Sequence, residues 1–325
     1  MRAFVYQSPD SFREAMNGYG QQSAFIAGGT TLVDLMKLEV MTPSQLIDIN
    51  QTPARGIELG PEYLKLGALE KMSDVAEHVD VKTHFPVVSQ ALLKSASAQL
   101  RNMASIGGNI LQRTRCGYFR DVATPCNKRQ PGSGCSAIEG NHRMHAILGT
   151  SNSCIATHPS DLAVALVALD ASLKLQGSDG ERLLKLDEFY LLPGETPNLE
   201  NQLKPGELIT EIQVPRLDLA QRSLYLKIRD RESYEFALTS AAVAVALDGE
   251  TVRDARVAVG GVGTKPWKLP QVAQALIGKR LDRETIEASS NMAAEGAHPL
   301  KQNGFKVELV KRTVARALMN LGGLV

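Results

Sequence analysis

The four cysteines constrain this 325-residue chain most, because all of them fall between positions 116 and 154. Cys116, Cys126, Cys135 and Cys154 follow the spacing C-x9-C-x8-C-x18-C. They lie in a stretch, 113–155, that is rich in Gly, Pro, Arg and Asn and has no clear periodicity. A structureless loop of this length is unusual in a compact domain unless it is functional or cross-linked. We therefore expect one feature to hold the four cysteines together.

The spacing alone leaves the nature of that feature open. Structural zinc sites usually pair cysteines about two to four residues apart, and common ferredoxin motifs are also tighter than this one. Four thiolates fit a [4Fe–4S] cluster, a four-thiolate zinc site, or two disulfides formed in an oxidising compartment. The remaining alternative is four unrelated buried cysteines.

The cysteine stretch is also basic. Nearby cations would stabilise either an anionic iron–sulfur cluster or a zinc–thiolate centre, so the charge does not separate these two. A solvated surface or a docking face for a partner would have the same composition. The basic residues are Arg113, Arg115, Arg120, Lys128, Arg129 and Arg143.

Composition excludes several classes of function. A net charge of +1 argues against a large electrostatic footprint for nucleic acid or an anionic membrane. The N-terminal residues MRAFVYQSPDSFREAM lack the apolar stretch of a signal peptide, and no apolar run approaches the ~20 residues of a membrane span. We expect a soluble chain with no nucleic-acid partner, no membrane insertion and no export signal of its own. A partner with an export signal could still carry the folded chain across a membrane.

Apolar patterning predicts two domains of an α+β protein. The first part alternates short apolar runs with helical patterns, which is typical of an α/β domain. Residues 239–262, TSAAVAVALDGETVRDARVAVGGV, contain two runs of β-formers joined through Asp248-Gly249, a strong hairpin signal. Helical periodicity follows at 269–279 and 305–321. We predict an N-terminal α/β domain at 1–215 with the cysteine loop 113–155 inserted, and a C-terminal domain of antiparallel sheet plus helices at 216–325.

Two glycine pairs suggest a dinucleotide site, although neither GxGxxG nor GxxxxGK[ST] is present. The first lies in Ile26-Ala27-Gly28-Gly29-Thr30-Thr31-Leu32, between a predicted strand and a predicted helix. Its backbone N–H groups could approach an anion closely beside the positive end of the helix. The second lies in Ser105-Ile106-Gly107-Gly108-Asn109. Each pair alone is more typical of a tight turn, whereas two in one domain fit a dinucleotide whose pyrophosphate lies between them.

Two further positions have ordinary structural explanations when taken alone. His158-Pro159-Ser160-Asp161 directly precedes the apolar run LAVALVALDASL, so Ser160 is predicted to cap a helix and Asp161 to favour its dipole. Lys227 lies in LYLKIRDR, on a predicted strand.

Taken together, these segments resemble a known family. FIAGGTTLVDLMK, SIGGNI, HPSDLAVAL, YLKIRDR and VAVGGVGTKPW, in this order, resemble the FAD-binding subunit of molybdenum hydroxylases, the family of the xanthine dehydrogenase and carbon monoxide dehydrogenase medium subunits, over essentially the whole chain. The segment LQRTRCGYFRDVATPCNKRQPGSGC, with CIATHPSD, resembles the cysteine loop of two branches. These are the bacterial periplasmic aldehyde oxidoreductases, which it resembles more, and the 4-hydroxybenzoyl-CoA reductases; in both the loop binds a [4Fe–4S] cluster.

The resemblance implies roles for individual residues. The backbone of 27–32 would wrap the FAD pyrophosphate, 105–109 would form a second phosphate and ribityl loop, and Asp161 would bond FAD polar groups. Ile209 would pack near the flavin ring, and Lys227 would lie at its pyrimidine edge and tune it. The implied FAD-binding set is Ile26, Ala27, Gly28, Gly29, Thr30, Thr31, Leu32, Ser105, Gly107, Gly108, Asn109, Ser160, Asp161, Ile209 and Lys227. The implied cluster ligands are Cys116, Cys126, Cys135 and Cys154.

The resemblance also implies an oxidoreductase complex. Its partners would be a small [2Fe–2S] subunit and a large molybdenum-cofactor subunit that oxidises an aldehyde to a carboxylic acid. Electrons would pass through FAD to an external acceptor, so no residue of this chain would act on the aldehyde. The location would be periplasmic through a signal on a partner, or alternatively cytoplasmic. Alternatives are a 4-hydroxybenzoyl-CoA reductase-like or xanthine dehydrogenase-like complex, and a non-catalytic scaffold stapled by zinc.

Overall fold

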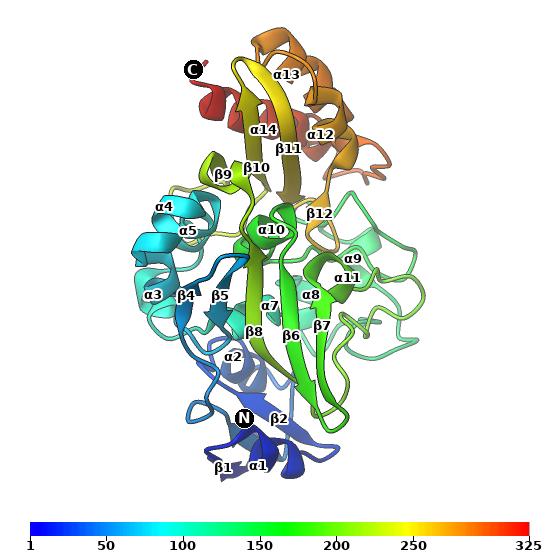
Figure 1. The fold of residues 1–325 in the computed structure, drawn as a ribbon. Coiled ribbons are helices and arrows are strands. Elements are labelled where there is room, and N and C mark those ends of the chain that lie inside the picture. Colours follow the sequence, from blue (N-terminus) through cyan, green and yellow to red (C-terminus); the bar gives the residue numbers. More distant parts are fainter. Residues whose placement is uncertain (325) are drawn as a thin grey trace.

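Three β-sheets follow one another from the N-terminal to the C-terminal end of the computed structural model, which describes residues 1–324 (Figure 1). The first sheet is parallel, in the order β1-β3-β2. Its strands and connecting helices are β1 (Val5–Gln7), α1 (Phe12–Asn17), β2 (Ser23–Ile26), α2 (Leu32–Lys37) and β3 (Gln45–Asp48). This unit is the α/β alternation that the sequence predicted, and it ends within the first fifty residues.

The second sheet is antiparallel and has the order β4-β5-β8-β6-β7. Its strands are β4 (Ile57–Leu59), β5 (Tyr63–Gly67), β6 (Ser172–Gly177), β7 (Gly180–Lys185) and β8 (Leu208–Pro215). More than a hundred residues separate β5 from β6 in the chain, and all of the cysteines lie in that interval. The sheet therefore fixes both ends of the segment that carries the cysteine loop.

Eight short helices lie in the interval between β5 and β6. They are α3 (Met72–Glu77), α4 (Val79–His84), α5 (Pro86–Leu93), α6 (Ala98–Arg101), α7 (Ile106–Ile110), α8 (Gly117–Arg120), α9 (Ser136–Glu139) and α10 (Asp161–Ala168). The cysteine loop contains only α8 and α9, and α11 (Leu186–Phe189) follows the second sheet's β7.

The third sheet is antiparallel, in the order β12-β11-β10-β9, and its centre is the predicted hairpin. Its strands are β9 (Ser223–Ile228), β10 (Thr239–Asp248), β11 (Thr251–Gly260) and β12 (Trp267–Lys268). Asp248 pairs with Thr251, and Gly249 has a φ of 58°, so the Asp-Gly turn is confirmed. The predicted boundary at 216 lies in the connection between β8 and β9, which contains the 3₁₀ helix η1 (Asp218–Gln221), and it stays a prediction.

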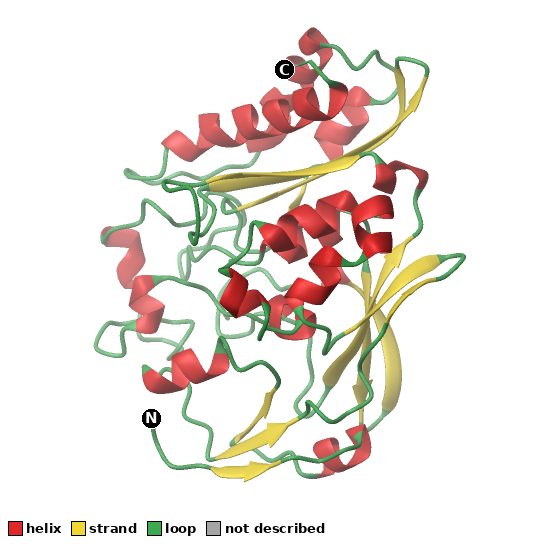
Figure 2. Cartoon of the chain, turned by 90° about the vertical axis from the view of Figure 1, so that its left-hand side faces the viewer, coloured by secondary structure: helices red, strands yellow, loops and turns green. Residues whose placement is uncertain are grey.

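The long hairpin is buried on both faces, which explains its continuous apolar run. Ala241, Val243 and Val245 join one core, while Ala242, Ala244 and Ala246 join the other. Figure 2 shows helices on both sides of the hairpin. The C-terminal helices are α12 (Pro270–Leu276), α13 (Arg283–Ser290), the 3₁₀ helix η2 (Asn291–Ala294) and α14 (Phe305–Gly322). These elements and sheets confirm the α+β class.

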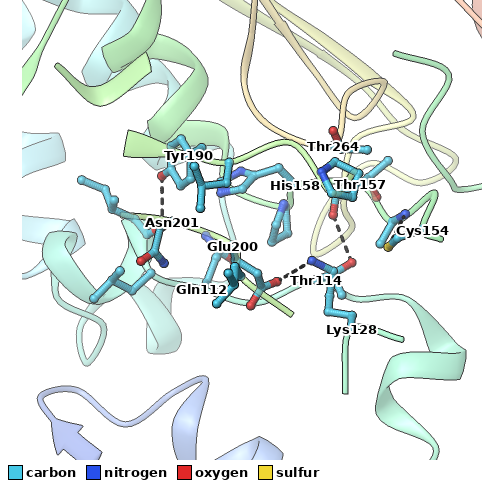
Figure 3. Close-up of a pocket in the computed structure, with 17 residues that line it drawn as sticks. Gln112, Thr114, Lys128, Cys154, Thr157, His158, Tyr190, Glu200, Asn201 and Thr264 are labelled. Atoms are coloured by element: carbon cyan, nitrogen blue, oxygen red, sulfur yellow. Dashed lines mark hydrogen bonds and ion pairs between the residues drawn. The ribbon is translucent and has the colours of Figure 1, made fainter. Parts of the chain in front are cut away.

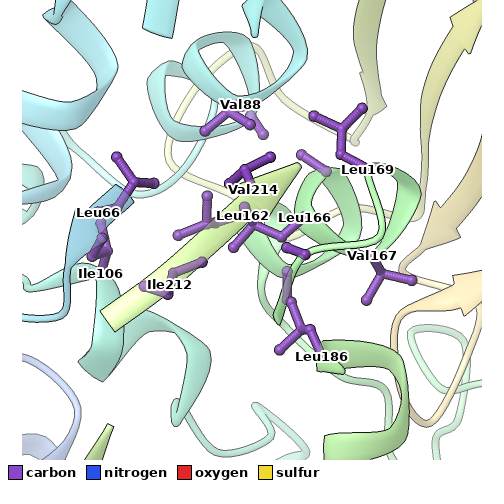
Figure 4. Packing of buried hydrophobic residues seen from close by; sticks show 14 of the residues in the cluster. Leu66, Val88, Ile106, Leu162, Leu166, Val167, Leu169, Leu186, Ile212 and Val214 are labelled. Atoms are coloured by element: carbon purple, nitrogen blue, oxygen red, sulfur yellow. The ribbon is translucent and has the colours of Figure 1, made fainter. Parts of the chain in front are cut away.

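Helix α10 lies at the centre of the molecule, and every one of its residues is buried. Leu162 and Leu166 face Ile212 and Val214 of the second sheet (Figure 4). Ser160 caps the helix, as predicted, because its Oγ accepts a hydrogen bond from the Ala163 amide at 3.0 Å. The turn before α10 is therefore fixed in the core. Within residues 1–324, no helix is long and apolar enough to cross a membrane.

Candidate functional site

The four cysteines line one small cavity, as the prediction of a common feature required. None of them is in a disulfide. Cys126 and Cys135 pair through an isolated antiparallel bridge, and Cys154 lies in a tight turn with Ser151. Within the described residues, however, no three His, Cys, Asp or Glu side chains surround a position suitable for a single metal ion. The four thiols thus line a cavity but do not converge on one position for a metal ion.

Two arginines of the cysteine loop attach it to helix α2. Arg120 and Arg115 donate to the Asp34 carboxylate, with N–O distances of 2.8 and 3.0 Å to Oδ2. The hydrogen bond from Arg120 is the main reason that the pKa of Asp34 is lowered. Phe119 and Cys126 pack against Leu35 of the same helix. The loop is therefore anchored directly after the first glycine pair.

A half-buried carboxylate holds two more cations of the loop. Lys128 Nζ lies 3.0 Å from Glu200 Oε1, and Arg113 Nε lies 2.5 Å from Oε2 (Figure 3 shows Lys128, Glu200 and Cys154). Burial alone would raise the pKa of Glu200, but the charges of Lys128 and Arg113 hold it below its ordinary value. These side chains are at most 24% exposed, so the interpretation of them as a solvated face is wrong. Burial raises the pKa of the Cys154 thiol, and the charge of Lys128 partly offsets that rise.

A much larger cavity, of about 530 Å³, borders Cys116. This volume is typical of small-molecule sites, which span about 300–1,000 Å³. Its walls come from the cysteine loop, the turn 157–161, the connection between β9 and β10, and the end of β11. Cys116 and Tyr118 line both this cavity and the cysteine cavity, so the two share a wall.

Three buried polar atoms in the wall of the large cavity have no hydrogen-bond partner within residues 1–324. They are Arg115 Nε, His145 Nδ1 and Ser240 Oγ. Buried polar groups are almost always paired in folded proteins, so these three atoms are exceptions in the cavity wall. Other polar side chains line the cavity, among them Asp121, Thr124 and Asn141, so the lining fits a ligand with many hydrogen-bonding groups, such as a flavin.

Asp161 lies in the same wall and is held by three donors. Lys227 Nζ is 2.7 Å from Oδ2, Tyr225 Oη is 2.6 Å from Oδ1, and Ser95 Oγ is 3.1 Å from Oδ2. Burial and the Asp161 charge raise the pKa of Tyr225 well above its ordinary value, so this hydroxyl stays a donor. The Lys227 side chain is only 1% exposed and does not line the cavity. Its predicted place at the flavin edge stays a prediction, and its observed contact is with Asp161.

The first glycine loop touches the residues directly before the second one. A Cβ on Gly28 would lie 2.1 Å from the Met103 carbonyl oxygen. Glycine is therefore required at position 28 because the Met103 backbone packs against it, and not in order to leave room for an anion. Gly29 has a φ of 69°, which favours glycine. A Cβ on Gly107 would lie 2.9 Å from the Ala68 Cβ. The phosphate contacts expected of both loops stay predictions.

The second glycine loop is linked to the turn before α10. Ser105 Oγ accepts from the Gly108 amide at 3.2 Å and caps α7. Asn109 Oδ1 accepts from Ser160 Oγ at 2.6 Å, which joins 105–109 to the wall of the large cavity. The structure does not bring Ile209 to that wall, because its side chain packs in the core beside β6.

Two residues at this site were not identified from the sequence. His145 Nε2 lies 3.1 Å from Cys116 Sγ, and burial, with the charges of Lys306 and His142, lowers the pKa of His145 to about 4. Lys306 is fully buried and donates to the Met144 and Gly261 carbonyls at 3.1 and 2.7 Å. His145 stands among the cysteines, which was an available signal. The sequence contained no signal for Lys306, because a lysine on an amphipathic helix is usually exposed.

Comparison with known proteins agrees with this arrangement. Residues 2–217 match the family described as the FAD binding domain in molybdopterin dehydrogenase, and residues 224–321 match the CO dehydrogenase flavoprotein C-terminal domain. The chain is 46% identical over 323 residues to the aldehyde oxidoreductase FAD-binding subunit PaoB of Escherichia coli, covering 98% of each. It is 27% identical to the glyceraldehyde dehydrogenase medium chain of Sulfolobus acidocaldarius, covering 97% of this chain and 96% of that relative.

Solved structures have the same fold. A chain of the carbon monoxide dehydrogenase from Hydrogenophaga pseudoflava gives a TM-score of 0.77 at 24% identity, covering 99% of this chain and 98% of that chain. A chain of quinoline 2-oxidoreductase from Pseudomonas putida also gives 0.77, at 20% identity, with the same coverage. At these identities the likeness shows the fold alone.

Proposed function

The chain belongs to the FAD-binding subunits of the molybdenum hydroxylases, a family of oxidoreductases, and within it we propose a subunit that carries FAD and a [4Fe–4S] cluster in an aldehyde-oxidising complex. The identity of 46% to an aldehyde oxidoreductase subunit, over nearly the full length of both chains, supports the substrate class. The proposed partners are a small [2Fe–2S] subunit and a large molybdenum-cofactor subunit.

The observation that carries the proposal is the shared wall between the two cavities. Four free thiols surround one cavity, and one of them, Cys116, also borders the 530 Å³ cavity. A zinc ion would need each sulfur at about 2.3 Å, whereas no three of these ligands gather around a single-ion position in residues 1–324. A larger cluster with bridging sulfides accepts thiolates that stand further apart. The donor set therefore favours an iron–sulfur cluster over a zinc staple.

The large cavity supports a flavin next to that cluster. When bound, FAD would exchange electrons both singly and in pairs, and so couple one-electron carriers to a two-electron acceptor. In this chain, the backbone of 27–32 and 105–109 would hold the phosphates, and Asp161 would accept from polar groups of the cofactor. Lys227 and Tyr225 fix the Asp161 carboxylate in the orientation in which it would do so.

The route of electrons can be tested in the purified heterotrimer. Under this proposal the complex oxidises an aromatic aldehyde such as benzaldehyde with a dye or physiological acceptor, and removal of FAD stops electron delivery to that acceptor. A complex that instead reduces a thioester-linked aromatic ring at the expense of a low-potential donor would replace the proposal with the reductase alternative. A complex that oxidises purines and not aldehydes would replace it with the xanthine dehydrogenase-like alternative.

The location forms part of the proposal. The resemblance to periplasmic aldehyde oxidoreductases supports a periplasmic complex that a signal on a partner subunit exports. Fractionation of cells that express all subunits tests this. Complex found only with cytoplasmic markers would favour the cytoplasmic alternative.

A further inference from the structure

One side chain in residues 1–324 is hydrogen-bonded to a cysteine sulfur. His145 Nε2 lies 3.1 Å from Cys116 Sγ, within the range of an N–H···S contact. The other thiol with a hydrogen bond, Cys154, accepts at 3.5 Å from the Ala156 backbone amide. Cys116 is thus distinguished from the other three cysteines by its partner.

Cys116 also has a distinct position, because it lies in the wall that the two cavities share. His145 also lines the large cavity. Its ring stands 6.5 Å from that of Tyr118, the other residue common to both walls. The hydrogen bond therefore lies in the wall between the smaller cavity and the larger one.

The backbone that carries His145 is held firmly from the C-terminal domain. Asn303 Nδ2 donates to the His145 and Ala146 carbonyls, and Lys306 Nζ donates to the Met144 carbonyl. Asn303 and Lys306 are both fully buried. A backbone fixed by buried donors on the next domain cannot easily move the ring away from the sulfur.

We propose that His145 is a positioning residue that donates its Nε2–H to the thiolate of Cys116, the cluster ligand beside the large cavity. This hydrogen bond raises the reduction potential of the cluster. This inference rests on the proposed function. A thiolate can only accept, so the ring proton lies on Nε2, and the buried, unpaired Nδ1 is then a bare acceptor rather than an orphaned donor. Hydrogen bonds to thiolate ligands stabilise the more negative, reduced cluster and so tune its potential.

The test compares the intact complex with three variants. His145→Phe removes the donor and keeps a planar ring, while His145→Gln places an amide N–H near the position of Nε2. His142→Phe is the matched control, since His142 is buried in the same segment but bonds the Ala137 carbonyl and Gln302 rather than a cysteine. Iron, sulfide and FAD are measured first, and the cluster is then titrated anaerobically with EPR detection.

In His145→Phe, we expect the ratio of reduced to oxidised cluster at a fixed ambient potential to fall about tenfold, which equals about 59 mV for one electron. His145→Gln should recover most of this change, and His142→Phe should titrate like the wild type. If His145→Phe does not retain iron, the inference is tested on His145→Gln alone. That variant must then keep both its iron and a cluster potential close to that of the wild type. An unchanged potential in a loaded His145→Phe complex, or an equal shift in His142→Phe, would overturn the inference. Wild-type complex without iron and sulfide would instead overturn the proposed function.

Discussion

Lys227 of β9 and Asp161, the first residue of helix α10, form an almost completely buried ion pair. The Nζ–Oδ2 distance is 2.7 Å, and the two side chains are 1% and 7% exposed. Asp161 lies in the cavity wall and Lys227 behind it, so the carboxylate that would meet the ligand is oriented by a cation that does not line the cavity.

Replacing Lys227 by Met should lower the free energy of unfolding by about 3–5 kcal/mol, because it leaves a buried carboxylate without its cation. Denaturant unfolding of the complex-free chain, with flavin content measured in parallel, checks this. The control is Lys65→Met, which removes an exposed pair with Glu58 at 3.3 Å and should cost no more than about 1 kcal/mol. Equal losses in the two variants would contradict the importance of the buried pair.

The close contact between Gly28 and Met103 predicts the effect of Gly28→Ala. The new Cβ would meet the Met103 carbonyl at 2.1 Å, and this neighbour is backbone that cannot rotate away. We expect a loss of about 1–3 kcal/mol in the free energy of unfolding and reduced FAD retention. In Gly304→Ala the nearest atom is 3.9 Å away, so stability should not decrease. Full stability and full flavin in Gly28→Ala would show that the loops separate without cost.

Lys306 predicts a pH dependence of stability. Burial, together with the charge of Arg143, lowers the pKa of Lys306 to about 7. The unfolded chain, with a lysine pKa of about 10.4, binds the proton more tightly, so stability should rise with pH between about 7 and 10. The slope from this one group reaches about 1.4 kcal/mol per pH unit.

Unfolding of wild type and Lys306→Met at several pH values isolates that contribution. The wild type should gain stability relative to the variant as the pH rises from about 7, and the difference should stay constant below that value. Lys301→Met, at an exposed position just before α14, should run parallel to the wild type. A constant difference for Lys306→Met across the whole range would mean that Lys306 keeps its proton in the folded state.

The cysteine cavity predicts the effect of Cys126→Ser on iron. Loss of one thiolate should make the cluster labile, so iron and sulfide per chain should fall during gel filtration in the presence of a chelator. Ser153→Ala is the control, because Ser153 lines the same cavity and its hydroxyl makes no hydrogen bond within residues 1–324. Unchanged iron in Cys126→Ser would remove Cys126 from the ligand set.

The features that the sequence predicted depend on local signals. Asp248-Gly249 closes a hairpin and Ser160 caps α10, because turn and capping preferences act over a few residues. The antiparallel second sheet was not foreseen, since β5 and β8 pair across nearly 150 residues of chain. The burial of Lys306, the reason for Gly28 and the contact of His145 with Cys116 likewise depend on distant neighbours. Periodicity and spacing do not contain that information.

Metal and flavin analysis of this chain, isolated anaerobically from its complex, tests the central claim most directly. We expect one FAD with about four iron and about four sulfide per chain, and an absorption spectrum in which flavin overlies a broad iron–sulfur band. Zinc without sulfide, or metal-free protein that retains its four free thiols, would contradict the proposal. The cysteine loop would then be a structural staple beside the large cavity, with no part in electron transfer.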